Sequence, residues 1–216
     1  MVKNNIDLSK KFNIQGISLF RQLGDSKYKS ALSIEEINER ILNSCMFSGK
    51  ISVEQDQGFQ CGLVRASIAE LVSIEELPVV KLHNAGKPFR LNTTEHPLLC
   101  IVKELRNLQM HLSSVQLSEF SKDLLCGRPD KPENAIPVTR ELFFINNLKV
   151  SDFESLRNYN NYDVSQFKEA LTWFDAEQKE WGISELLEQA SYVYAESLSN
   201  MIENHVALTL DRKVIS

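Results

Sequence analysis

The chain has 216 residues, of which 43% are apolar and 25% are charged, a composition ordinary for a soluble globular protein of one or two domains. Its formal net charge of −5 argues against a protein that binds nucleic acid through general positive charge, although it does not exclude a local basic pocket. With only eight glycines and six prolines, a long turn-rich β architecture is disfavoured.

Apolar residues at helical spacing predict three helices before Pro78. The first is expected near residues 14–28. The other two each follow a pattern typical of a capping box, Ser33 to Glu36 and Ser52 to Gln55, in which the last side chain reaches back to the first free amides. Gly49 is expected to end the second helix, and the third ends before the proline.

After a loop over residues 78–95, His96 and Pro97 are expected to open the clearest helix of the chain. Apolar side chains recur along it at spacings of three and four residues, which is the pattern of a helix packed on a core. These side chains are Leu98, Ile101, Leu105, Leu108, Leu112 and Val115.

The second half begins with a break at residues 127–132. The run Glu141–Ile145 is either a short strand or the start of a helix, and its periodicity does not decide between them. Asp163 is expected to cap a helix that ends at Gly182, and a last helix begins at Ser184.

These elements predict a mainly α fold. We expect a bundle of four to five helices over residues 1–125, then a connector and a C-terminal helical hairpin over residues 126–216, with at most a short β element.

The N-terminus and the cysteines bear on location. Residues 1–7 contain no apolar h-region, so we expect no signal peptide, and no run is long enough to cross a bilayer. The four cysteines are widely spaced without a C-x-x-C pair, which indicates buried free thiols in a reducing compartment rather than disulfides or zinc ligands. They are Cys45, Cys61, Cys100 and Cys126. We therefore expect a cytoplasmic protein with no membrane partner, no metal and no other cofactor.

Arg106, Asn107 and His111 form the cluster that most clearly points to chemistry, because they lie together within an apolar-striped helix. An arginine holds a phosphate, an amide orients it and an imidazole moves a proton near neutral pH, so the three suit a phosphodiester. On an ideal helix Arg106 lies roughly 140° from His111, whereas Asn107 shares a face with it. A common site then needs Arg106 to reach around the helix or a second subunit to complete it.

This cluster resembles the motif of the HEPN superfamily, in which four to six residues separate an arginine, often followed by a polar residue such as asparagine, from a histidine on a helix of a bundle. The likeness extends over roughly residues 33–125 as a helix pattern; Arg90 and His96 also match the spacing, but in a predicted loop. The resemblance implies a metal-independent endoribonuclease. Arg106 and Asn107 would hold the scissile phosphate of an RNA substrate, and His111 would transfer a proton. It also implies a homodimer and, in a bacterial defence or toxin–antitoxin system, a cognate antitoxin.

The loop before this helix is the most basic short stretch of the chain. Its basic side chains, Lys81, His83, Lys87 and Arg90, either contact substrate phosphates or belong to a solvated connector. Aromatic residues near the C-terminus stand at helical spacing, which is more typical of a core or an interface than of base stacking.

Two functions therefore stay open. The first is the HEPN-type endoribonuclease that the motif favours. The second is a non-catalytic helical interaction protein, which the acidic net charge favours. Its terminal helices would bind a partner protein or build a homodimer.

Overall fold

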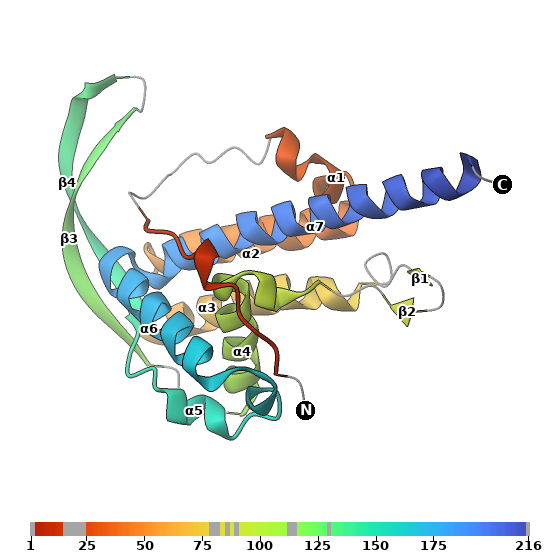
Figure 1. Cartoon of the computed structure of the whole chain (residues 1–216). Helices are drawn as coiled ribbons and strands as arrows, with labels where there is room; N and C mark the ends of the chain where they lie inside the picture. Colours follow the sequence, from red (N-terminus) through yellow and green to blue (C-terminus); the bar gives the residue numbers. More distant parts are fainter. Residues whose placement is uncertain are drawn as a thin grey trace.

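The computed structural model describes residues 3–14, 25–77, 83–84, 87–88, 91–111, 116–128 and 131–214. For residues 83–84, 87–88, 109–111, 127–128, 131–132 and 205–214 it describes the backbone alone. These parts of the chain are mainly helical, which confirms the expected class, but they hold more α-helices than the four to five predicted (Figure 1). The helices are α1 (Lys29–Leu32), α2 (Glu35–Ile51), α3 (Gln57–Ser73), α4 (Pro97–His111), α5 (Val150–Glu154), α6 (Val164–Trp181) and α7 (Ile183–Val214).

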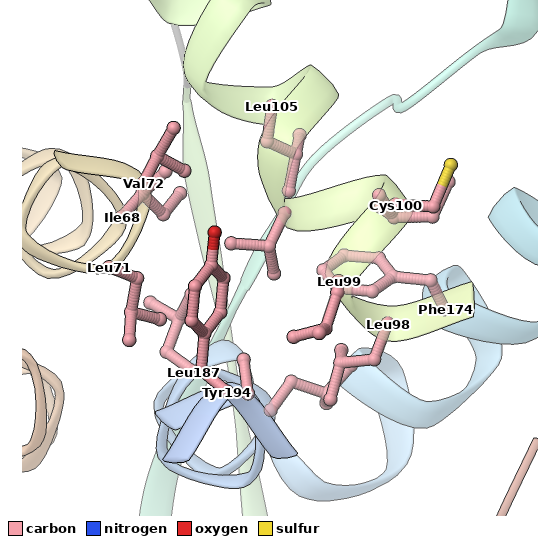
Figure 2. Close-up of a cluster of buried hydrophobic side chains, with 14 of the residues drawn as sticks. Ile68, Leu71, Val72, Leu98, Leu99, Cys100, Leu105, Phe174, Leu187 and Tyr194 are labelled. Carbon is pink, nitrogen blue, oxygen red and sulfur yellow. The ribbon is translucent and has the colours of Figure 1, made fainter. Parts of the chain in front are cut away.

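The core lies where α3, α4, α6 and α7 meet. Figure 2 shows the buried side chains that these helices send into it, among them Ile68, Leu71, Val72, Leu98, Leu99, Cys100, Leu105, Phe174, Leu187 and Tyr194. The hydroxyl of Tyr194 is satisfied inside this core, because it donates a hydrogen bond of 2.8 Å to Glu75 Oε1. Lys103 Nζ lies 3.0 Å from the same carboxylate, so an ion pair ties α4 to the 3₁₀ helix Ile74–Glu76 that follows α3.

Helices α2 and α3 form a hairpin that packs against α7. Buried serines lie where the three helices meet: Ser44 Oγ is 2.9 Å from Ser67 Oγ, and Ser191 Oγ is 3.2 Å from Ser44 Oγ. Small side chains allow the helices to approach closely, and their hydroxyls bond to one another instead of remaining unsatisfied.

Both predicted capping boxes are wrong. Helix α2 begins at Glu35 without a side-chain cap, and Ser33 Oγ donates instead to a preceding carbonyl. Helix α3 begins later than expected, because Asp56 is the residue that caps it, accepting a hydrogen bond of 2.9 Å from Phe59 N. Before α2 the carbonyl of Ser30 accepts a hydrogen bond from the hydroxyl of Ser33, and before α3 the carboxylate of Asp56 takes the place that Ser52 was expected to have.

Two other boundaries also differ. Gly49 does not end α2, which continues to Ile51. The helix expected near residues 14–28 falls mostly on residues 15–24, outside the described residues, and its last part forms a 3₁₀ helix at Ser26–Tyr28.

Helix α4 begins at Pro97, as predicted. Before it, in the stretch expected as a loop, two short strands pair antiparallel, β1 (His83–Asn84) and β2 (Lys87–Pro88). Leu112 and Val115, at the end of the predicted stripe, lie outside the described residues.

The described chain ends in two consecutive helices, α6 and α7. Asp163 caps α6 by accepting a hydrogen bond of 3.1 Å from Gln166 N. Gly182 ends α6 with φ +86°, a conformation that favours glycine, and α7 starts at the next residue. None of the described helices is both long and apolar enough to cross a membrane.

A long β ribbon is the largest departure from expectation. Strand β3 (Leu117–Arg128) pairs antiparallel with β4 (Lys131–Ile145), so Glu141–Ile145 is strand and the β structure is not short. Figure 1 shows the ribbon passing the turn between α6 and α7, with its far end extending beyond the helices. The expected boundary between residues 125 and 126 falls inside β3.

The N-terminal residues 3–14 form a strap across α6. Asn4 N donates to the carbonyl of Asn161 at 2.6 Å, and Trp173 Nε1 donates to the carbonyl of Phe12 at 3.0 Å. Both ends of the strap are therefore fixed to the C-terminal half of the chain.

Candidate functional site

Helix α4 carries the predicted catalytic cluster at the margin of the core. Leu105 and Leu108 are buried, whereas Arg106 and Asn107 beside them are half-buried. His111 is the last residue of α4, and only its backbone is described. The structure thus places all three residues on one helix, and it brings Arg106 and Asn107 to the edge of the core.

The amide of Asn107 is engaged by a buried carboxylate. Asn107 Nδ2 donates to Glu104 Oε2 at 3.1 Å, and Tyr162 OH donates to Glu104 Oε1 at 2.7 Å. Glu104 is only 1% exposed, so these two donors supply the hydrogen bonds that a carboxylate needs when it leaves water. The network ties α4 to the segment before α6. Asn107 therefore has a structural role as a donor to Glu104. Its contact with a phosphate stays a prediction.

Arg106 is the cation of the cluster. Within the part of the chain that the structure describes, it forms no ion pair. Its guanidinium is therefore not committed to a described carboxylate, although Glu104 is only two residues away on the same helix.

The basic loop is described only in part. Lys81 and Arg90 lie outside the described residues, and for His83 and Lys87 the backbone alone is described. Asn84 pairs with Lys87, and His83 with Pro88, so the backbones of His83 and Lys87 come together in one small hairpin. A common phosphate site for the four side chains stays a prediction.

His96, which belongs to the second match to the motif, has a structural role at the start of α4. Its Nδ1 accepts a hydrogen bond of 3.2 Å from Leu98 N, and its ring lies 6.0 Å from that of Phe12. Burial, with a smaller contribution from the charge of Lys10, lowers the pKa of His96 to about 4. The imidazole is therefore neutral at pH 7, as its acceptor role requires.

All four cysteines are free thiols, as predicted, but only Cys100 is buried, whereas the other three are partly exposed. Burial raises the pKa of Cys45 to about 11 and that of Cys100 to about 12. Both thiols are therefore protonated at neutral pH and are poor nucleophiles.

The ribbon provides a second candidate site, and two glutamines fix its base. The buried side chain of Gln178 on α6 accepts from Ile145 N at 2.9 Å and donates to Ile145 O at 3.0 Å. Across the ribbon, Gln57 Nε2 at the start of α3 donates to Leu117 O at 2.7 Å. Each glutamine occupies backbone groups that a further strand would otherwise bind.

Farther out, the ribbon rests on the end of α6. Lys122 Nζ lies 3.7 Å from the ring centroid of Trp181 and 2.7 Å from Glu180 Oε1. Beyond these contacts apolar side chains face solvent: Leu125 is 78% exposed and Ile136 is 62% exposed. Large apolar side chains on a projecting element are typical of a binding surface.

Strands β3 and β4 were not predicted from the sequence. The run from Leu117 to Cys126 does not alternate cleanly between apolar and polar residues, so it gives no strand signal. One feature of the sequence does point to a strand here. Pro137 lies within a run of residues that favour β structure, and prolines in strands are confined mainly to sheet edges.

Within the described residues, no group of three or more histidine, cysteine, aspartate or glutamate side chains is arranged to hold a metal ion. Comparisons of the chain with protein-family models, with curated proteins and with solved structures found no match.

Proposed function

We propose that the chain is a non-catalytic binding protein whose helical bundle holds out the β3–β4 ribbon to a partner. One observation carries this proposal: the far end of the ribbon extends beyond the helices with Leu125 and Ile136 largely exposed (Figure 1). Two-stranded ribbons are marginally stable in water when nothing covers them, so a partner that covers this end would stabilise it.

The fixed base of the ribbon supports the same proposal. Gln57, Gln178 and Trp181 hold it from three positions on the bundle. An element that is already ordered loses little conformational entropy on binding, which favours affinity. A partner would thus meet a preformed surface.

The last helix is a weaker candidate for the interface than the sequence indicated. Leu187, Tyr194 and Leu198 of α7 are buried in the core of this chain. Removing residues 184–216 would therefore damage the fold as well as any interface, so point substitutions on the ribbon are the cleaner test.

The proposal is tested by affinity capture, with the full chain as bait in a lysate of the cells that produce it. The wild type is compared with a double variant that combines Leu125→Ser and Ile136→Ser. Val164→Ser is the matched control, because Val164 is 43% exposed on α6, away from the ribbon. We expect one partner, or a second copy of the chain, to be retained by the wild type and the control and lost at least tenfold by the double variant. Equal capture by all three proteins would contradict the proposal.

A metal-independent endoribonuclease of the HEPN type is a second candidate. It is supported by the position of Arg106, Asn107 and His111 on α4 and by an Arg106 side chain that forms no ion pair within the described residues. Here the purified protein would cleave RNA in the presence of EDTA, and His111→Ala would abolish cleavage without unfolding the chain. His96→Asn is the matched control and would retain activity. Cleavage that survives His111→Ala would remove this assignment.

A further inference from the structure

The two edges of the ribbon differ in their capacity to pair with another strand. The register and the hydrogen bond from Asn146 N to Gln116 O show which backbone groups face inward. Residues opposite each other alternate between pairs bonded across the ribbon and pairs whose N–H and C=O groups face outward. The backbone groups of Leu117 and Ile145 face outward from the ribbon, as their hydrogen bonds to Gln57 and Gln178 confirm.

The outer edge of β4 is interrupted near both of its ends. Pro137 lies opposite Leu125, at an outward-facing position, and it has no N–H to donate. Nearer the base, a Cβ on Gly182 would lie 3.4 Å from Phe143 O, so the turn between α6 and α7 sits against that edge.

The outer edge of β3 is open. By the same alternation, its outward-facing residues after Leu117 are Glu119, Ser121, Asp123 and Leu125. Within the described residues, no backbone hydrogen bond reaches these four, and none of them is a proline. This edge therefore offers a row of donors and acceptors at the spacing that an added strand needs.

A groove continues from this edge toward the bundle. It has a volume of about 780 Å³ and lies between the connection from α2 to α3 and the base of the ribbon. Its lining includes the carboxylates of Glu54, Glu119 and Glu141, and no lysine or arginine among the described residues. Val53 and Phe143 supply apolar surface beside them. The groove therefore favours a ligand that carries positive charge as well as apolar groups.

The two faces of β3 extend this preference along the strand. One face bears Glu119, Ser121 and Asp123, and the other bears Phe120, Lys122 and Leu124. A strand added beside β3 places its alternate side chains next to one face or the other. Its residues beside the first face would be basic, and most of those beside the second would be apolar.

We infer that β3 binds an extended segment of a partner protein in which basic and apolar residues alternate, added as a third strand of the ribbon with one end in the groove. The inference rests on the proposed binding function and specifies its edge and partner chemistry. Backbone hydrogen bonds would supply affinity, and the carboxylates would select lysine or arginine over glutamate.

The test is fluorescence anisotropy of the full chain with a labelled peptide of about eight residues, the length of a strand, alternating valine and lysine. A matched peptide has glutamate in place of lysine. We expect the lysine peptide to bind at least tenfold more tightly than the glutamate peptide. Ser121→Pro removes one outward N–H without breaking a bond to β4, and it should weaken binding at least tenfold. Ser121→Ala, which leaves the edge intact, should bind as the wild type does.

A second variant keeps the test independent of any folding defect in Ser121→Pro. Exchanging Glu119 and Asp123 for lysine should reverse the preference toward the glutamate peptide. The inference is overturned if the lysine peptide does not bind, if charge exchange leaves the preference unchanged, or if a labelled single-stranded RNA binds in the peptide's place. Failure here, with partner capture still lost in the Leu125→Ser and Ile136→Ser variant, would leave the binding function standing and remove only this edge and this partner chemistry.

Discussion

The side chain of Gln178 makes the two hydrogen bonds to Ile145 that a neighbouring strand would make. Its amide accepts from the N–H of Ile145 and donates to the C=O of the same residue, at 2.9 and 3.0 Å. Gln178 is fully buried and Ile145 is 2% exposed, so no water replaces these bonds. The pair thus joins the ribbon to the helical hairpin.

Replacing Gln178 by leucine should lower the free energy of unfolding by about 2–4 kcal/mol. The change keeps the volume close to constant but leaves the buried N–H and C=O of Ile145 without partners. Urea unfolding measures the loss. Gln55→Leu, at an exposed position before α3, is the control and should change stability by less than about 0.5 kcal/mol. A loss below 1 kcal/mol for Gln178→Leu would mean that the bond pair is dispensable.

Two glycines should respond in opposite ways to alanine. Gly182 has φ +86°, and a Cβ there would lie 3.3 Å from Leu142 Cβ, so Gly182→Ala should destabilise the fold by more than about 1 kcal/mol. Gly62 lies inside α3 with nothing within 4 Å of an added Cβ, so Gly62→Ala should stabilise by about 0.5–1 kcal/mol. Thermal unfolding of both variants compares them directly, and shifts of the same sign would disagree with the packing described.

Lowering the pH should destabilise the fold because of His96. Its pKa is lowered from 6.5 to about 4 in the folded protein, mainly by burial and then by Lys10, while Asp7 and Glu196 act in the opposite direction. The unfolded chain therefore binds a proton below pH 6.5 that the folded chain takes up only near pH 4. This contribution is complete above pH 6.5 and is lost as the pH falls toward 4, at a cost of roughly 2–3 kcal/mol.

The variant His96→Asn isolates this effect, because asparagine also caps a helix but does not titrate. Urea unfolding between pH 7 and pH 4 should show the wild type losing stability relative to the variant. A difference between the two proteins that stays constant over this range would show that His96 is not the group responsible.

The hydrogen bonds to Glu104 predict how substitutions on and near α4 change the stability of the fold. Tyr162→Phe and Asn107→Ala should each lower the free energy of unfolding by about 1–3 kcal/mol, since each removes a donor to a buried carboxylate. Arg106→Ala should change it by less than about 0.5 kcal/mol, because no described ion pair is lost. Chemical denaturation of the three variants tests this order. Equal effects of Arg106→Ala and Asn107→Ala would contradict the structural role of Asn107.

The helices with clean periodicity were predictable from sequence. The cap at Asp163, the end at Gly182 and the start of α4 at Pro97 each depend on one residue and its immediate neighbours. The pattern Ser33 to Glu36 failed because such caps also depend on competing partners, here the carbonyl of Ser30.

The ribbon and the Glu104 network could not be read from sequence because both depend on distant residues. Ile145 is bonded by a side chain 33 positions away, and Tyr162 lies 58 positions from Glu104. The cluster of Arg106, Asn107 and His111 was found because its members are neighbours on one helix. Glu104, which accepts the hydrogen bond of Asn107, lies only three residues away in the sequence. The burial of its carboxylate could not be inferred from the sequence.

Amide hydrogen exchange along β3, followed by NMR in the free protein, shows whether the outer edge of this strand is unpaired. We expect an alternating pattern: the outward amides of Glu119, Ser121, Asp123 and Leu125 should exchange about a hundredfold faster than the inward amides of Phe120, Lys122 and Leu124. Equal protection of both sets would show that the edge of β3 is already paired, so that it could not bind a further strand.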